Sequence, residues 1–291
     1  MVSKTRLGPL PDMTEFEVLL EDITTTKFHQ AVIEKGVKIA EGIEEVEGVI
    51  LKGSLAANKG DVFSDIDFQV IHDKDQSVSL DILERFVEEL EKVEPIIQHF
   101  PSTANPNDSI IYLHPFLKFE LSVATCDEMK TRWRAGLGKV LFDRSGLASD
   151  VISEAKKHKF NIDEHIPVIT SRAAAIPVFT YITAGHLVRG EEITALHDID
   201  WIRNDMLCVS GWLLGLYDEG CRRAEERFPA EVLDYYNRSR IKTVDEIWEG
   251  LQILLDWYEQ WLVPEFDKLQ IAHSQVQVGQ MRDILRLLSS K

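Results

Sequence analysis

The residues of this sequence best suited to chemistry are a Gly53-Ser54 pair and two aspartates, Asp65 and Asp67, separated from it by ten residues. In proteins Mg²⁺ is commonly held by one or two carboxylates together with phosphate oxygens of a substrate. A glycine lets the backbone approach a phosphate closely, and the N–H groups at a helix start attract anions. The two motifs together predict a site for a magnesium-bound nucleotide, although an Asp-x-Asp pair alone is also typical of a solvated strand edge.

The two aspartates need a strand to hold them on the same side of the backbone. Residues 49–52 and 66–71 are short apolar runs of the kind that form buried strands. Because side chains alternate across a strand, Asp65, Asp67 and Gln69 are predicted to share one face. The apolar residues between them then face a core.

A third carboxylate, Glu120, lies in another alternating run, residues 116–124. Lys118 and Ser122 share its face, and apolar side chains occupy the opposite face. A glutamate in so apolar a strand is costly to bury without a partner, and a metal ion or an accepted proton would supply one. The alternative is an exposed sheet face, on which Glu120 would have no special role.

Hydrophobic periodicity predicts the elements that position these residues. The first part of the chain is expected to be a mixed sheet covered by helices. Further helices are expected at 26–43 and 81–93, and further strands at 96–100 and 110–114. From about residue 165 only helices are expected, the clearest being an apolar stripe with three tryptophans over residues 244–262. The sequence thus predicts an α+β fold with a change of architecture near residue 160.

The motifs resemble those of the nucleotidyltransferase superfamily, which includes DNA polymerase beta and the kanamycin nucleotidyltransferases. The resemblance rests on Gly53-Ser54, the Asp65-Ile66-Asp67 triplet and the later, strand-borne Glu120. The second half, in particular residues 181–191, looks like the helical region of the aminoglycoside 6-adenylyltransferases and related antibiotic nucleotidyltransferases. This implies a nucleotidyltransferase domain at 1–160 and a helical, acceptor-binding domain at 161–291.

The resemblance also implies a role for each matched residue. Gly53 and Ser54 would bind the triphosphate of ATP or another nucleoside triphosphate, and Asp65 and Asp67 would hold Mg²⁺. Glu120 would complete the metal site or accept the proton of the substrate hydroxyl. The 6-adenylyltransferases are expected to have an aspartate at this third position, whereas the kanamycin enzymes have a glutamate, so both roles stay open.

The implied reaction transfers a nucleoside monophosphate, AMP from ATP in the first instance, onto a hydroxyl of a small molecule. An aminoglycoside-like antibiotic is one candidate acceptor. In this family type the acceptor lies between the sheet domain and the helices, where Glu191 and Glu192 are the candidate ligands. An ordinary solvated helix end is the competing interpretation of these two glutamates.

Charge and composition restrict the partners. A formal net charge of −17, with an acidic excess in both halves, is unfavourable for a protein that must neutralise a nucleic acid. The same charge permits a cationic acceptor without indicating one. Three cysteines without metal-type spacing, no apolar leader and no expected bilayer-spanning segment favour a cytoplasmic protein without a membrane partner.

Two other functions are compatible with the same motifs. One is a nucleotidyltransferase of the antitoxin type, which adenylylates a partner protein rather than a small molecule. The other is a non-catalytic nucleotide-binding module. The second is disfavoured because all three carboxylates and the Gly-Ser turn are present, whereas a degenerate site would have lost at least one of them.

Overall fold

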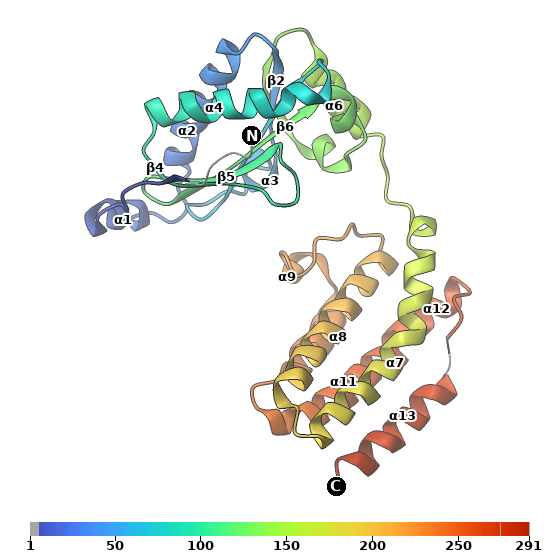
Figure 1. The fold of residues 1–291 in the computed structure, drawn as a ribbon. Helices are drawn as coiled ribbons and strands as arrows, with labels where there is room; N and C mark the ends of the chain where they lie inside the picture. Colours follow the sequence, from blue (N-terminus) through green and yellow to red (C-terminus); the bar gives the residue numbers. More distant parts are fainter. Residues whose placement is uncertain (1–5, 274, 291) are drawn as a thin grey trace. The chain divides into compact units, whose positions relative to one another are not determined.

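The computed structural model describes residues 6–273 and 275–290. The chain divides into two compact units, Met1–Lys159 and Phe160–Lys291 (Figure 1). The first contains a sheet with helices on it, and the second consists of helices. The α+β class expected from the sequence is therefore confirmed.

The N-terminal unit is built on a seven-stranded sheet with the strand order β1-β4-β5-β6-β3-β2-β7. The strands are β1 (Arg6–Leu7), β2 (Val46–Leu51), β3 (Ile66–His72), β4 (Ile96–Pro101), β5 (Asp108–Leu113), β6 (Leu117–Thr125) and β7 (Lys139–Asp143). Strands β3 and β6 pair in parallel, and the other pairs of the described sheet are antiparallel. Adjacent strands β3 and β6 come from segments about fifty residues apart in the sequence.

One face of this sheet is apolar and is covered by the helices α2 (Lys27–Gly42) and α4 (Ser79–Val93) (Figure 1). At its centre the ring of Phe68 lies 5.1 Å from that of Phe119 and 5.6 Å from that of Phe86. Burying each such ring stabilises the fold by about 1.5–3 kcal/mol. Because side chains alternate along a strand, the residues on either side of Phe68 in β3 and of Phe119 in β6 point to the opposite face of the sheet.

The opposite face is only partly covered by apolar packing. A small core joins Ile50, Ile71 and Ala124 of the sheet to the helix α6 (Leu147–Ala155). The polar residues Asp67 and Glu120 lie beyond this core on the same face and are half-buried. The sheet therefore presents a partly open polar surface.

The expected helices at 26–43 and 81–93 and the expected strands all form, with ends shifted by up to about three residues. Strands β1 and β7 and the two helices that follow β6 within this unit, α5 (Cys126–Lys130) and α6, were not predicted. The remaining helices of this unit are α1 (Met13–Leu20) and the single turn α3 (Gly53–Ala56).

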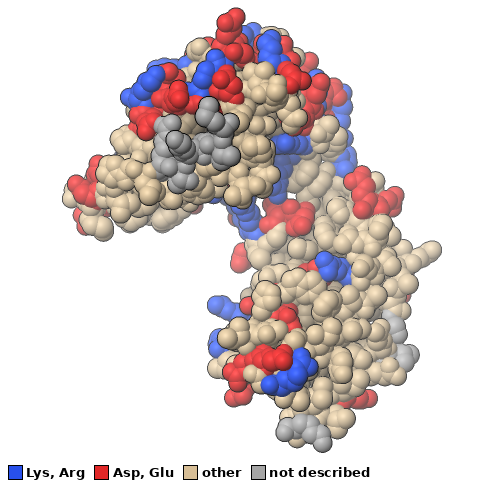
Figure 2. All heavy atoms as spheres, viewed as in Figure 1, with Lys and Arg blue, Asp and Glu red and all other residues tan. Residues whose placement is uncertain are grey.

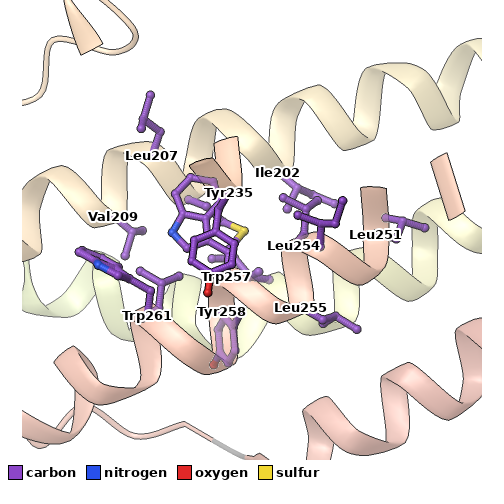
Figure 3. Close-up of a cluster of buried hydrophobic side chains, with 14 of the residues drawn as sticks. Ile202, Leu207, Val209, Tyr235, Leu251, Leu254, Leu255, Trp257, Tyr258 and Trp261 are labelled. Atoms are coloured by element: carbon purple, nitrogen blue, oxygen red, sulfur yellow. The ribbon is translucent and has the colours of Figure 1, made fainter. Parts of the chain in front are cut away.

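The described residues of the C-terminal unit form helices joined by loops, without a strand. Its helices are α7 (Ile166–Val188), α8 (Glu192–Leu213), α9 (Ala224–Arg227), α10 (Ala230–Arg238), α11 (Ile247–Trp257), α12 (Val263–Lys268) and α13 (Gln275–Leu288). Trp257, Tyr258 and Trp261 lie in its core (Figure 3). Trp257 and Trp261 are thus core residues, as their helical periodicity suggests, and Trp248 packs against this core while only partly buried.

Helix α7 is long and apolar enough, by length and composition alone, to cross a bilayer. The sequence expectation that no segment meets this criterion was wrong. Ile169, Ala173 and Ile176 of α7 are buried in the helical core, and a core helix can meet the same criterion. Length and composition of this one helix are weak support for a membrane span.

Candidate functional site

The pairing of β3 with β6 brings the three predicted carboxylates together. Asp67 and Glu120 are register partners on these parallel strands, so both point to the polar face. Asp65 immediately precedes β3, and its Oδ2 accepts a hydrogen bond from Lys118 Nζ at 2.8 Å. The same Nζ lies 2.5 Å from Glu120 Oε1. Asp65 and Glu120 are therefore within reach of one shared cation.

The Gly53-Ser54 turn lies against the carboxylate of Asp67. Gly53 has φ +68°, and a Cβ added to it would lie 2.0 Å from Asp67 Oδ2. Glycine is required here both for the left-handed backbone and for the close approach of the carboxylate. Ser54 is half-buried, and within the described residues its hydroxyl has no hydrogen-bond partner. The turn is thus in direct contact with one of the three carboxylates.

Two lysines complete the polar face, and sequence reasoning assigned neither of them a role. Lys118 stands two residues before Glu120, so strand alternation alone placed it on the same face. Burial disfavours its charged form, but hydrogen bonds to Asp65 and Glu120 outweigh this, and the pKa of Lys118 lies above its usual range. An ammonium group therefore neutralises part of the acidic cluster.

The second lysine, Lys52, directly precedes the Gly-Ser turn. Its Nζ donates to Gln69 Oε1 at 3.1 Å, and Gln69 in turn donates to the carbonyl of Ser122 at 3.1 Å. Burial lowers the pKa of Lys52, and the charges of Asp67 and Glu120 oppose this shift. No sequence pattern predicts this contact, because it depends on the non-local pairing of β2, β3 and β6.

The chemistry of the donors fits a hard divalent cation. Asp65 and Glu120 already share the ammonium nitrogen of Lys118, and Asp67 is the register partner of Glu120 on the adjacent strand. Mg²⁺ needs only one or two carboxylates when phosphate oxygens and water complete its octahedron. In the part of the chain that the structure describes, no three His, Cys, Asp or Glu side chains are already arranged around a common metal position. Binding of a metal ion would thus require side-chain adjustment around Lys118.

The predicted acceptor ligands lie at the turn between α7 and α8. Glu191 accepts a hydrogen bond from Arg189 Nε at 2.9 Å and also pairs with His186. These partners, Arg189 first and His186 second, lower the pKa of Glu191 to about 2. Glu192 is exposed at the first position of α8. The carboxylate of Glu191 is therefore held by neighbouring residues, and an acceptor role for either glutamate stays a prediction.

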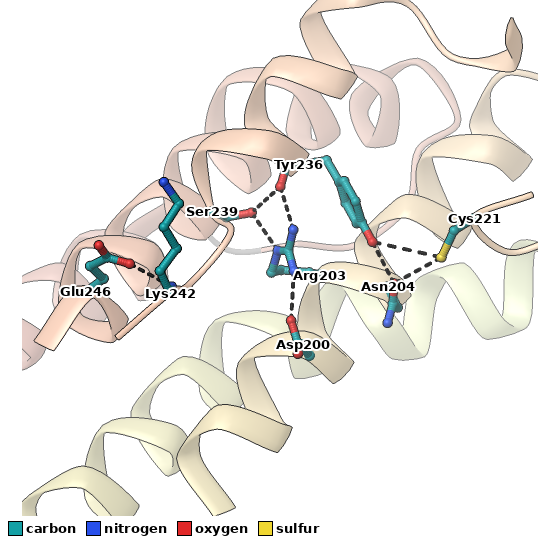
Figure 4. Close-up of polar contacts among 8 residues, drawn as sticks. All are labelled: Asp200, Arg203, Asn204, Cys221, Tyr236, Ser239, Lys242 and Glu246. Atoms are coloured by element: carbon teal, nitrogen blue, oxygen red, sulfur yellow. Dashed lines mark hydrogen bonds and ion pairs between the residues drawn. The ribbon is translucent and has the colours of Figure 1, made fainter. Parts of the chain in front are cut away.

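Arg203 belongs to a structural network in the helical unit (Figure 4). Its guanidinium donates to Ser239 Oγ at 3.1 Å, to Asp200 Oδ1 at 2.7 Å and to the carbonyl of Tyr236 at 2.8 Å. The side chain is 8% exposed. With these partners, Arg203 joins α8 to α10 and stabilises the bundle.

Residues 33–122 match a family model described as a nucleotidyltransferase domain. This segment runs from α2 to β6 and contains the Gly-Ser turn and all three carboxylates. No curated protein matches the chain by sequence.

Solved structures that match the chain are distant from it in sequence. An aminoglycoside 6-adenyltransferase from Bacillus subtilis is 11% identical with a TM-score of 0.43, over 90% of this chain and 98% of that chain. A nucleotidyltransferase-like protein from Exiguobacterium sibiricum is 13% identical with a TM-score of 0.41, over 90% and 89%. A spectinomycin adenyltransferase from Enterococcus faecialis is 10% identical with a TM-score of 0.34, over 90% and 99%.

Proposed function

We propose, from the premise that residues 33–122 form a nucleotidyltransferase domain, that this chain transfers AMP from ATP to a hydroxyl of a small molecule in a Mg²⁺-dependent reaction. The observation that carries the proposal is that Asp65 and Glu120 both contact the ammonium group of Lys118, beside Asp67 and the Gly53 turn. A hard cation and a phosphate chain are the ligands that such a combination suits.

Different residues of the site are proposed to bind the phosphates and to hold the metal ion. The backbone at Gly53 and the hydroxyl of Ser54 would hold the β- and γ-phosphates. Held by Asp65, Asp67 and Glu120, Mg²⁺ would neutralise phosphate charge and lower the pKa of the acceptor hydroxyl. These contacts would fix the α-phosphorus for in-line attack.

In the transfer step, the acceptor oxygen forms a bond to the α-phosphorus. The bond from that phosphorus to the oxygen leading to the β-phosphate breaks, and pyrophosphate leaves. The acceptor proton passes to Glu120 if this residue is the general base, or to solvent if it is only a metal ligand. The half-exposed position of Glu120, at the open part of the polar face, is compatible with both roles.

We assign the acceptor to the class of small molecules rather than nucleic acid. On the face shown in Figure 2, the acidic and basic side chains of the N-terminal unit are intermixed. Together with the net charge of −17, this is a poor surface for a polyanion. The helical unit is proposed to bind the acceptor, with Glu191 and Glu192 as candidate ligands, and the site of action is proposed to be the cytoplasm.

A pyrophosphate-release screen tests this proposal. The purified protein is incubated with Mg²⁺ and each of four nucleoside triphosphates, together with hydroxyl-bearing antibiotics and metabolites. The expected result is pyrophosphate release with ATP that depends on one acceptor class, and a product heavier by one AMP. Labelling of a protein in lysate without a small-molecule product would instead support protein adenylylation. Binding of Mg-ATP without release across the whole panel would contradict catalysis.

A further inference from the structure

Lys118 occupies the position between two of the carboxylates to which a metal ion would bind. Its Nζ lies 2.8 Å from Asp65 Oδ2 and 2.5 Å from Glu120 Oε1, and its side chain is 25% exposed. The lysine and Glu120 belong to the same strand, two residues apart, so the alternation of the strand places both side chains on the same face. Asp65 and Glu120 thus each already pair with the ammonium group of Lys118.

Lys118 neutralises part of the negative charge on the polar face of the sheet. Three carboxylates, Asp65, Asp67 and Glu120, are accompanied by the ammonium groups of Lys118 and Lys52. Lys52 is directed to Gln69 by a hydrogen bond of 3.1 Å, whereas Lys118 is directed to the carboxylates. With both ammonium groups charged, these five groups together carry one negative unit, a weak attraction for a free divalent ion, and the nearby charges of Asp108 and Arg132 are opposite in sign.

We infer that Lys118 is an internal counter-cation that competes with the divalent metal ion for Asp65 and Glu120 and leaves them when a nucleotide binds. The inference rests on the proposed function. A triphosphate supplies oxygens to the metal ion and an anionic partner to the released ammonium group. Metal and nucleotide therefore bind cooperatively, and the free protein binds metal weakly.

This assigns Lys118 a role in addition to charge balance in the resting protein. When displaced, its ammonium group can reach a phosphate oxygen without leaving the polar face, because lysine carries its charge on a flexible stem. Lys118 is in this sense a competitor of the metal ion in the free protein and a binding residue for the nucleotide in the complex. A merely structural ion pair would contribute nothing to the gain in metal affinity that a bound nucleotide gives.

The test measures Mn²⁺ binding by electron paramagnetic resonance, with no acceptor and no turnover. Lys118→Met is compared with the wild type and with Lys118→Arg, which keeps the cation. The expected result is that Lys118→Met binds Mn²⁺ about tenfold or more tightly in the absence of nucleotide. It should also lose most of the increase in affinity that a non-hydrolysable ATP analogue gives the wild type. Lys118→Arg should behave like the wild type.

Two controls separate the inference from the proposed function. Lys130→Met removes a similar ion pair within helix α5, Lys130 to Asp127 at 3.2 Å, which involves none of the three carboxylates, and should leave Mn²⁺ affinity unchanged. Asp65→Asn should abolish the tight binding gained by Lys118→Met. Equal or weaker Mn²⁺ binding in Lys118→Met, with Asp65-dependent binding in the wild type, overturns the inference alone. Absence of Mn²⁺ binding in every variant, even with the nucleotide analogue, overturns the metal site and the inference together.

Discussion

The carboxylate of Asp67 lies directly against the backbone of Gly53, so that a Cβ on Gly53 would lie 2.0 Å from Asp67 Oδ2. This contact joins the turn at the end of β2 to β3, the strand that carries Asp67. Its consequence is that a side chain added at Gly53 would displace the carboxylate of Asp67.

Gly53→Ala is expected to disrupt the site through both its φ of +68° and the clash with Asp67. Strain of this kind typically costs about 1–3 kcal/mol of stability. Pyrophosphate release should fall more than stability does, because the displaced carboxylate is part of the proposed metal site. The measurements are chemical denaturation and the release assay on the same preparation.

Gly146→Ala is the matched control for that variant. Gly146 has φ +92°, and nothing lies within 4 Å of an added Cβ. It should therefore lose stability by backbone strain and keep its activity. Equal losses of activity in the two variants would show that the contact with Asp67 is unimportant.

Asp67→Asn is expected to reduce nucleotide transfer by about a hundredfold or more, because it removes a charged ligand from the proposed metal site. The fold should be retained, since Asp67 is half-buried and lies outside the apolar cores. Pyrophosphate release and circular dichroism measure the two effects. Asp73→Asn, at an exposed aspartate paired with Lys74, is the control. Normal turnover of Asp67→Asn would refute the metal assignment.

Glu120→Gln keeps the shape of the side chain and removes its charge. If Glu120 accepts the proton of the acceptor, kcat should fall by about 10²- to 10⁴-fold. The Mn²⁺ affinity of the nucleotide complex, measured on the same variant, then assigns the role. Unchanged affinity indicates the general base, and weakened affinity indicates a ligand. Retention of both activity and metal affinity would exclude Glu120 from the site.

The N-terminal unit is expected to lose stability as the pH falls below about 6.5. His29 and His72 are buried there, against the carbonyl of Ser64 and the hydroxyl of Ser79, and burial lowers the pKa of both. The folded state thus keeps them neutral while the unfolded state takes up protons. Their contribution is fully present above the unfolded pKa and is lost as the pH falls towards the depressed folded values.

Urea denaturation followed by circular dichroism between pH 7.5 and 5 checks this expectation. The free energy of unfolding should fall across this range, because protons bind the unfolded state in preference to the folded state. A His29→Gln, His72→Gln double variant should show a shallower dependence on pH, whatever its stability at pH 7.5. An identical slope in the wild type and the double variant would rule out these two histidines as the source.

Local patterns were enough to predict most elements of the sheet and both of its apolar-face helices. Strand β7 was missed because residues 139–143 are short and half-exposed, without the alternation that marks β3 and β6. Strand β1 is a two-residue pairing with β4, and it exists only because that edge is there to accept it. Such elements depend on their partners rather than on their own sequence.

The sequence by itself determined which residues share a face, because the side-chain period of a strand is two. It therefore placed Asp65 with Asp67 and Lys118 with Glu120. Only the tertiary structure decided that these two pairs meet, since the register of β3 on β6 is set by non-local packing of their apolar faces. That register makes Lys118 the shared cation of Asp65 and Glu120. The same assembly directs the buried Lys52 to Gln69, a contact that no local pattern encodes.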